Sequence, residues 1–451
     1  MEGGNDIILD DNINITHDES EHQESGNTPR ERINSQDFET VERDETGYAV
    51  DLCNKWIIQP YRVCLRGMGW YELVTDPSPV MKLLRWIWVL FISMVITATL
   101  ITQILSCFRR DQFESELVPV TSGNHTVEVI RCNVSVVSNS IIPDLLLLTT
   151  YFYGIYLFWS GQEYLQNLAG QVFVQCYKFT AWPDPTSRRL INTIFFYLIL
   201  GVAYIVVSLA VRIADAAVFD LFDGNVTVSW PDGGPQFSGG GKLVLVIFSL
   251  FGFIFFDAVY IMAIINYAIQ SELNIYLLSA LRIKVERREH KSLDDAVKDI
   301  NRANNYLKVL NGKTATAVAL IMFNVATAAL NGLIVLQDNN NSTDRTVVAT
   351  ITAVLWSLLV VFPFIQAARV TAACNGLLAS GPIIRGRPLQ YMGSPQLELD
   401  SFSIFTLSIT MRAEIFGIPV YPWMAYLCAV AFSFTLLLLC QTGDYDYAEW
   451  L

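Results

Sequence analysis

The chain has 451 residues, of which 52% are hydrophobic and only 16% are charged, and its mean hydropathy is +0.37. A soluble enzyme of this length carries more charge, so the composition excludes that class and indicates an integral membrane protein. The formal net charge of −13 is concentrated in residues 1–46, which hold 14 Asp and Glu against three Arg, and the remainder is nearly neutral.

Residues 1–46 are rich in Asp, Glu, Asn and Ser and contain few aromatic residues. Such a segment does not bury enough apolar surface to offset the entropy of ordering, so it is predicted to be a disordered acidic cytoplasmic tail. It lacks the basic and apolar regions of a signal peptide, and we expect the first hydrophobic helix to act as an uncleaved signal anchor. An amphipathic pre-membrane segment, residues 47–80, follows.

Seven apolar segments reach the roughly 20 residues that a helix needs to cross about 30 Å of hydrocarbon. They cover residues 82–106, 141–160, 190–214, 243–270, 315–337, 346–370 and 421–442. The predicted fold class is therefore all-α, with seven transmembrane helices. The corresponding divisions of the chain are spans one to four (81–270), a cytoplasmic helical segment (271–313), spans five and six (314–370), a cytoplasmic loop with the first part of the last helix (371–418), and the pore helix with the C-terminus (419–451).

The orientation of the helices follows from basic residues, which resist translocation when they flank a span. The segments 47–85, 161–190, 271–313 and 369–412 together hold 21 Lys and Arg, whereas the alternate segments hold five. The N-terminus is therefore predicted to be cytoplasmic. Because the number of spans is odd, the C-terminus is predicted to be extracellular, which is opposite to a G-protein-coupled receptor.

Glycosylation sequons support the same orientation, because Asn-x-Ser/Thr is modified only on lumenal or extracellular loops. Five sequons lie in the loops with few basic residues, at Asn124, Asn133, Asn225, Asn340 and Asn341. A further match at Asn14 lies in the Asn-rich tail and is interpreted as a chance occurrence. Both signals indicate a multi-pass plasma membrane protein.

Cys107 and Cys132 flank the first outer loop, where the compartment is oxidising, and they either form a disulfide or remain free. The other cysteines are expected to be small packing residues. No Cys or His group has the spacing of a metal site, so neither a metal nor another cofactor is predicted.

The cytoplasmic segment 271–313 carries a helical pattern. Ser292 and Asp295 resemble the start of a capping box, and apolar residues then recur at helical spacing at Leu293, Ala296, Val297, Ile300, Leu307 and Leu310. A basic surface that binds lipid headgroups and a helical domain that joins subunits are both compatible with this pattern. We favour the second, because the apolar stripe needs a partner.

The last helix is predicted to have two parts. Residues 398–418 carry charged side chains and fit a helix packed against protein better than one facing lipid. Pro419 and Pro422 then remove backbone donors and are expected to bend the chain before the final apolar run.

Asp257 lies midway along the fourth span, where a carboxylate is costly unless it pairs or faces water. It either binds a cationic ligand or accepts hydrogen bonds that hold the fold. Arg212 and Asp215 are spaced to pair with each other and are interpreted as structural. Four further residues are candidates to line a small-molecule site in the outer half of the bundle, or to be packing residues: Tyr151, Tyr204, Asn331 and Trp356.

The sequence resembles the insect chemoreceptor superfamily, and within it the gustatory-receptor-like proteins. The resemblance rests on seven spans with a cytoplasmic N-terminus, on residues 57–73 before the first span, and on the segment AEIFGIPVYPWMAYLCAVAFSFTLLLLCQ that ends at Gln441. The family closes on Thr-Tyr, five apolar residues and Gln-Phe; here the apolar run and Gln441 fit, as in a divergent member.

The resemblance implies a homotetrameric or heterotetrameric, non-selective cation channel opened by a small-molecule ligand. Four copies of the last helix would line the pore, each subunit would hold a ligand in the outer half of spans two to six, and the cytoplasmic ends of spans four to seven would join the subunits. The expected partners are thus the ligand, permeant cations and the lipid bilayer, without nucleic acid.

Polar residues in the last span suggest a pore-lining face, although a span without charge could also face lipid. Thr435, Gln441 and Thr442 recur at nearly helical spacing, with Leu438 between them on the same face. By resemblance to the family, the gate lies at Leu438 and Thr442. A ring of leucines can close a pore by dewetting, and Thr442 would weaken that seal.

Three carboxylates follow the last span directly: Asp444, Asp446 and Glu449. Four subunits would place a ring of them at the pore mouth, where they would concentrate cations. A solvated acidic terminus that only aids solubility is the alternative.

Competing functions fit less well. A secondary transporter predicts repeated halves with broken helices in both, yet only the last helix here carries a break. A non-conducting receptor or scaffold with the same fold stays open. An intramembrane enzyme is not expected, since Asp257 has no aspartate partner in a matching span.

Overall fold

The structure is a computed structural model and describes residues 55, 59–70, 79–106, 115–122, 125–132, 142–160, 168–172, 185–218, 227–229, 239–290, 292–336, 343–386, 395–428, 430, 431 and 433. All of these residues belong to the unit Thr46–Leu451.

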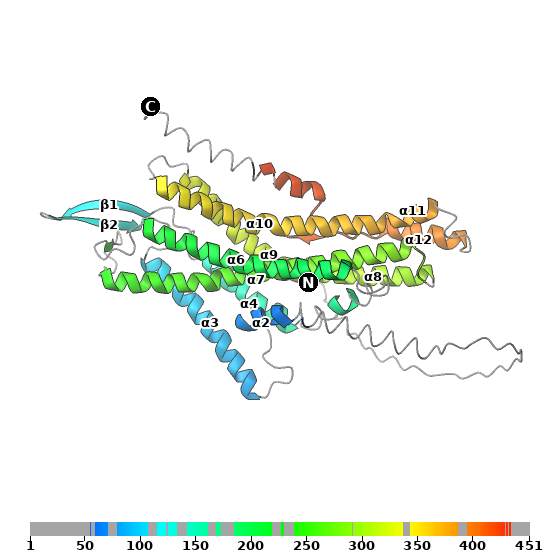
Figure 1. The fold of residues 1–451 in the computed structure, drawn as a ribbon, viewed down its shortest axis with the longest axis horizontal. Helices are drawn as coiled ribbons and strands as arrows, with labels where there is room; N and C mark the ends of the chain where they lie inside the picture. Colours follow the sequence, from blue (N-terminus) through cyan, green and yellow to red (C-terminus); the bar gives the residue numbers. More distant parts are fainter. Residues whose placement is uncertain are drawn as a thin grey trace, which may run out of the picture. The chain divides into compact units, whose positions relative to one another are not determined.

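Long apolar helices make up most of the described chain (Figure 1). They are α3 (Pro79–Ser106), α4 (Ile142–Ser160), α6 (Pro185–Val218), α7 (Gly239–Glu286), α9 (Ala315–Leu336) and α10 (Thr343–Leu378). Among the described residues, five helices are long and apolar enough to cross a membrane, and the apolar part of α4, Leu145–Trp159, is shorter. These helices coincide with the first six predicted spans.

The 48-residue helix α7 is the central element of the bundle, and it packs against α3, α6, α9 and α10. Two glycines let neighbouring helices approach. A Cβ on Gly252 would overlap the side chain of Thr99 on α3, and a Cβ on Gly201 of α6 would overlap Ile261 and Ile265 on α7. Larger residues at these positions would push α3 and α6 away from α7.

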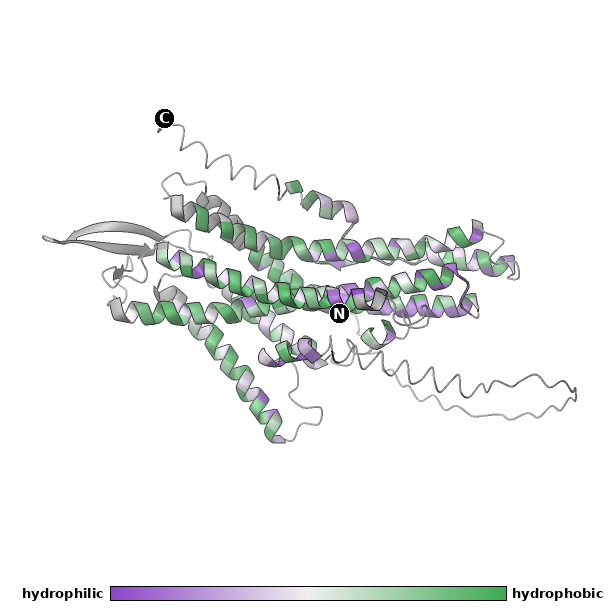
Figure 2. Cartoon of the chain, in the orientation of Figure 1, coloured by the Kyte–Doolittle hydropathy of each residue, from purple (hydrophilic) through white to green (hydrophobic). Residues whose placement is uncertain are grey.

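The cytoplasmic segment forms the predicted helix, α8 (Leu293–Val309). Ser292 caps it, since its Oγ accepts a hydrogen bond from the backbone N–H of Asp295 at 3.2 Å. The predicted stripe is buried at Ala296, Ile300 and Leu307. A π-helical turn, η3 (Leu310–Thr314), then joins α8 to α9. Hydrophilic residues are more frequent along α8 than along the spans (Figure 2).

The two-part last helix is confirmed as a break, but the predicted cause is wrong. The first part, α12 (Gln396–Ser408), ends well before residue 418, and it is preceded by the short α11 (Ser380–Gly386). Strands β4 (Glu414–Ile415) and β5 (Ile418–Pro419) then form an antiparallel hairpin. We call residues 411–420 the hairpin segment.

The chain reverses in the hairpin segment at Phe416 and Gly417, whose φ angles are 57° and 69°. Positive φ at both central residues is the requirement of a type I′ turn, which fits the twist of paired strands. Pro419 pairs in β5, and Pro422 is the first residue of the following helical stretch. The reversal thus comes from the turn, and Pro422 stands where a helix tolerates proline.

A small sheet is the one departure from the all-α prediction. Strands β1 (Ser115–Ser122) and β2 (His125–Cys132) pair antiparallel, and β3 (Thr227–Ser229) pairs parallel with β2. The sheet joins the first outer loop to the loop between α6 and α7.

The pre-membrane segment contains α2 (Gln59–Gly67), which buries Tyr61 and Leu65 one helical turn apart. Trp70 follows and is fully buried against α4, where a Cβ on Gly154 would overlap its ring. The Tyr61 hydroxyl donates a hydrogen bond to Asn266 Oδ1 of α7 at 2.7 Å. The predicted amphipathic segment is therefore tied to the bundle by one face.

Candidate functional site

A group of charged and aromatic residues is buried between α6, α7 and α10. We call it the membrane charge cluster; its members are Arg212, Asp215, Phe253, Asp257 and Trp356. Arg212, Asp215 and Asp257 are 3%, 8% and 3% exposed. Charged groups this deeply buried in apolar spans mark functional sites by default.

Aromatic rings from two helices hold Arg212 in place. Its guanidinium carbon lies 5.5 Å from the ring centroid of Phe253 on α7 and 5.5 Å from that of Trp356 on α10. A cation over an aromatic face is attracted by the ring quadrupole, by about 0.5–2 kcal/mol per pair. The guanidinium therefore joins three helices at one point.

The predicted ligand residues separate into two groups. Asp257 lies one helical turn after Phe253 on α7, so it shares a face with a ring that contacts Arg212, and Trp356 contacts Arg212 directly. Tyr204 on α6 is partly buried and packs against the core. Asn331 belongs to α9, but its side chain lies outside the described residues.

Tyr151 is committed to a different contact. Its hydroxyl donates to the Met68 carbonyl at 3.2 Å, and its ring centroid lies 6.3 Å from that of Trp70. It is 0% exposed. The structure thus gives Tyr151 a role in seating the pre-membrane segment against α4.

An ion pair joins the same three helices toward their cytoplasmic ends. Glu272 of α7 is 1% exposed and bonds to Arg369 of α10 through both carboxylate oxygens. Tyr197 of α6 donates its hydroxyl to Glu272 Oε1 at 2.6 Å and accepts a bond from Gln366 Nε2 at 2.8 Å. We call Tyr197, Glu272, Gln366 and Arg369 the inner ion-pair network.

Polar residues of α7 connect the pre-membrane segment to the π-helical turn. Gln270 Nε2 donates to Asn266 Oδ1 at 3.1 Å, and Gln270 Oε1 accepts from the Thr314 hydroxyl of η3 at 2.8 Å. Asn266 also accepts from Tyr61. All of these side chains are buried, so each bond satisfies a group that burial would otherwise leave costly.

The hairpin segment is bonded to two helices through its backbone. Asn311 of η3 donates Nδ2 to the Arg412 carbonyl at 2.8 Å and accepts at Oδ1 from the Glu414 N–H at 3.0 Å. Thr371 Oγ1 of α10 accepts from the Ala413 N–H at 3.1 Å. We call these three bonds the hairpin clamp.

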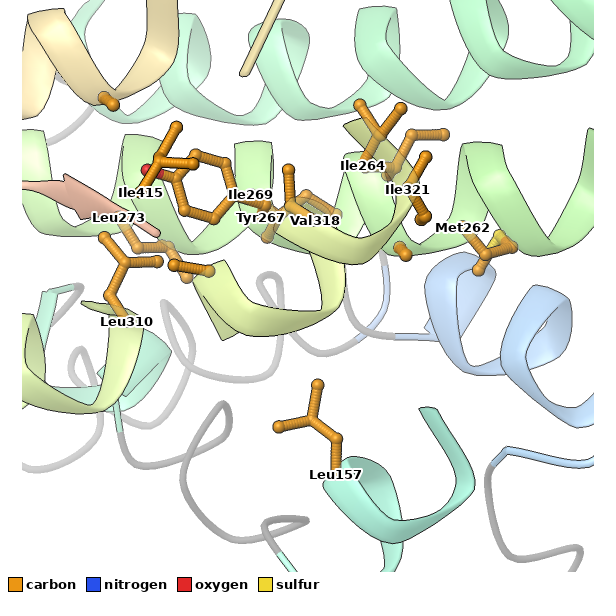
Figure 3. Close-up of a cluster of buried hydrophobic side chains, with 14 of the residues drawn as sticks. Leu157, Met262, Ile264, Tyr267, Ile269, Leu273, Leu310, Val318, Ile321 and Ile415 are labelled. Atoms are coloured by element: carbon orange, nitrogen blue, oxygen red, sulfur yellow. The ribbon is translucent and has the colours of Figure 1, made fainter. Parts of the chain in front are cut away.

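Packing reinforces the hairpin clamp. Ile415 is 1% exposed and lies in the buried cluster with Tyr267, Leu273 and Leu310 (Figure 3). The start of the last helix is therefore fixed to α7, η3 and α10, two of which also carry the membrane charge cluster. A π-helical turn at this junction fits the frequent occurrence of such turns at functional sites.

A buried histidine lies in the turn between α7 and α8. The side chain of His290 is 6% exposed, and its Nδ1 lies 3.8 Å from Asp299 Oδ2. Burial is the main cause of a pKa below the ordinary 6.5, and Lys284 lowers the pKa further, while Asp299 and Asp295 raise it. Burial prevails, so the folded protein disfavours the protonated form.

Several predicted residues lie outside the described residues and stay predictions. These are the pore and terminal residues Thr435, Leu438, Gln441, Thr442, Asp444, Asp446 and Glu449, the sequons Asn124, Asn133, Asn225, Asn340 and Asn341, and Cys107. Cys132 ends β2, but its side chain is not described.

Sequence reasoning missed the inner ion-pair network and the hairpin clamp. Glu272 and Arg369 lie at the ends of predicted spans, where charged residues are expected to face water, so neither attracted attention. Asn311 and Thr371 belong to no motif. The signal that was available is Arg212 with Asp215, two charges within a span.

The fold matches two solved structures of the insect olfactory receptor OR5 from Machilis hrabei. The structure in complex with eugenol has a TM-score of 0.58 at 14% identity, covering 87% of this chain and 99% of the receptor chain. The second has a TM-score of 0.51 at 13% identity, with coverages of 86% and 99%. No protein-family model and no curated protein matches the sequence.

The spans and the likeness together define the class. The chain is a multi-pass helical membrane protein. Its fold is that of the insect olfactory receptors, which confirms the predicted fold and, at the level of fold, the resemblance to the insect chemoreceptor superfamily. The matched structures are receptors rather than enzymes.

Proposed function

We propose that this protein is a ligand-gated, non-selective cation channel of the insect chemoreceptor superfamily, of the gustatory-receptor-like type. The observation that carries the proposal is the fold match, which covers 99% of the olfactory receptor chain. One matched receptor is in complex with eugenol, which supports a small-molecule ligand here.

The connections between helices support gating. The membrane charge cluster lies on α6, α7 and α10, and the hairpin clamp ties η3 and α10 to the start of the last helix. A ligand that shifts α10 relative to α7 would therefore act on the last helix through Thr371. The transporter alternative is weaker, because α10 continues unbroken through Pro363.

Assembly as a tetramer is proposed from an apolar stripe on α12. Leu397, Ile404 and Leu407 are 81%, 66% and 71% exposed and recur at helical spacing on one face. Exposed apolar stripes on a polar helix end mark association surfaces. Copies of this chain would bury the stripe, as a homotetramer or with a related subunit.

The pore and its orientation complete the proposal. Thr435, Leu438, Gln441 and Thr442 would line the pore, with the gate at Leu438 and Thr442. Asp444, Asp446 and Glu449 would concentrate cations at its mouth. The N-terminus would be cytoplasmic in the plasma membrane, with glycans on the five sequons and a disulfide between Cys107 and Cys132.

The test is to express the chain alone in cells, measure the particle size, and record whole-cell currents during application of a ligand panel. The proposal expects a tetrameric particle and ligand-evoked cation currents. A monomeric particle without current would overturn it. Replacing Asn124, Asn133 and Asn225 by Gln should abolish a glycosidase-sensitive mobility shift, and absence of that shift in the unaltered chain would contradict the orientation.

A further inference from the structure

We propose that the ligand is a small organic cation, such as a protonated amine, whose charge is bound by Asp257 in the membrane charge cluster. This inference rests on the proposed function, in which the outer half of the bundle holds the ligand. It adds the chemical class of that ligand.

The charges of the cluster do not balance. One guanidinium, Arg212, is buried with two carboxylates, Asp215 and Asp257, so the ionised cluster carries one net negative charge. The imbalance concerns the sum of the charges, because each of the three residues has at least one interaction within the protein. Glu272, the other buried charge among the described side chains, is matched by Arg369.

No other basic residue of these helices reaches the cluster. Lys242 precedes Phe253 on α7 by 11 residues, and Arg345 precedes Trp356 on α10 by the same number. At 1.5 Å per residue, each lies about 16 Å away along its helix, beyond the reach of a Lys or Arg side chain.

Position assigns the excess charge to Asp257. Asp215 follows Arg212 by three residues on α6, the spacing at which helical side chains pair. Asp257 comes from α7, on the face shared with Phe253 and with Tyr260, whose hydroxyl accepts a hydrogen bond from Asn324 Nδ2 of α9 at 2.8 Å. Asp257 is therefore the carboxylate surrounded by aromatic groups from a second helix.

A net charge in an apolar span is costly, and only a positive charge removes the cost. A neutral ligand leaves the sum unchanged, whereas an ammonium group beside Asp257 brings it to zero. The rings of Phe253 and Trp356 are suited to contact the apolar part of such a ligand. A proton on one carboxyl would also balance the charge, and the experiment separates these possibilities.

The experiment compares ligands of nearly equal shape and different charge on the purified full-length protein in nanodiscs. Phenethylamine and phenethyl alcohol form one pair, and benzyltrimethylammonium adds a cation that cannot lose a proton. Binding is measured as the concentration-dependent rise in melting temperature, which follows from preferential binding to the folded state. The proposal expects both cations to bind at least tenfold more tightly than the alcohol.

Three variants assign the effect. Asp257→Asn should weaken cation binding at least tenfold and leave alcohol binding unchanged, Asp257→Glu should retain the preference for cations, and the exposed control Asp400→Asn should behave as the unaltered chain. If Asp257→Asn fails to fold, the comparison of ligands on the unaltered protein still decides. Equal binding of the alcohol and the cations would overturn the proposal, as would an Asp257→Asn protein that keeps its preference.

Currents recorded with the same ligands separate this inference from the proposed function. Stabilisation by cations without any current would support the ligand class and contradict the channel. Currents evoked by the alcohol alone would support the channel and overturn the ligand class.

Discussion

Asn311→Ala removes two of the three bonds of the hairpin clamp, those to the Arg412 carbonyl and the Glu414 N–H. A hydrogen bond between neutral groups contributes about 0.5–1.5 kcal/mol, and a buried group left without a partner costs about 1–3 kcal/mol. Arg412 and Glu414 are partly exposed, so water replaces part of the loss. We expect a total of about 1–3 kcal/mol.

The functional consequence follows from the position of the hairpin clamp between the ligand site and the last helix. A coupling free energy of about 1–3 kcal/mol changes a linked affinity about 5-fold to 150-fold. Asn311→Ala should therefore change the ligand concentration for half-maximal current by about that factor. Binding in the channel-independent thermal assay should change much less, because Asn311 contacts none of the membrane charge cluster residues in the bonds described.

The assay pairs whole-cell currents with thermal unfolding of the purified protein. Asn305→Ala is the matched control, since Asn305 is an exposed asparagine on the preceding helix α8. Thr371→Val is the second variant; it keeps the shape and removes the acceptor for the Ala413 N–H. The reasoning is refuted if Asn311→Ala matches Asn305→Ala in both melting temperature and half-maximal concentration.

Arg369→Met should destabilise the protein by about 3 kcal/mol, because it leaves the Glu272 carboxylate buried and uncompensated, whereas Glu272→Gln should cost less and the double variant should recover part of the loss; equal losses in all three would count against the inner ion-pair network. His290→Gln should flatten the fall of melting temperature with acidification, because a pKa lowered in the folded state makes stability fall as pH drops below 6.5, and an unchanged profile would show that His290 is not the cause. Ile404→Glu should convert the tetramer to smaller particles in size-exclusion chromatography while leaving the melting temperature of the subunit nearly unchanged, and an intact tetramer would exclude the α12 stripe as the interface. Neutralising Asp444, Asp446 and Glu449 together should lower single-channel cation conductance, and unchanged conductance would leave the acidic terminus a role in solubility only.

Much of the fold was predictable because length and hydrophobicity determine a membrane helix. The spans and the helix that begins after Ser292 follow from apolar periodicity and a cap, both local properties of the sequence. The hairpin segment was not predictable in this way. A type I′ turn favours Asn-Gly or Gly-Gly, and Phe416 at its first central position gives no such signal, so the adjacent prolines offered a simpler account of the break.

The candidate site was predictable only in part, because bonds between helices depend on which faces meet. Asp257 is conspicuous as a charge in a span, and Trp356 as an aromatic residue near the outer half. That Arg212 lies over both Phe253 and Trp356 depends on the rotation of three helices, which no local pattern specifies. Tyr151 shows the reverse: a plausible ligand residue by position, it is bonded to Met68 from the pre-membrane segment.

The central claim, that this chain forms a ligand-gated cation channel, is tested most directly by single-channel recording. Purified protein would be reconstituted alone in a planar bilayer, with benzyltrimethylammonium or a ligand found in the panel added to one side. The account predicts discrete cation currents whose open probability rises with ligand concentration. A bilayer that stays silent under a ligand concentration that stabilises the same protein against unfolding would contradict it.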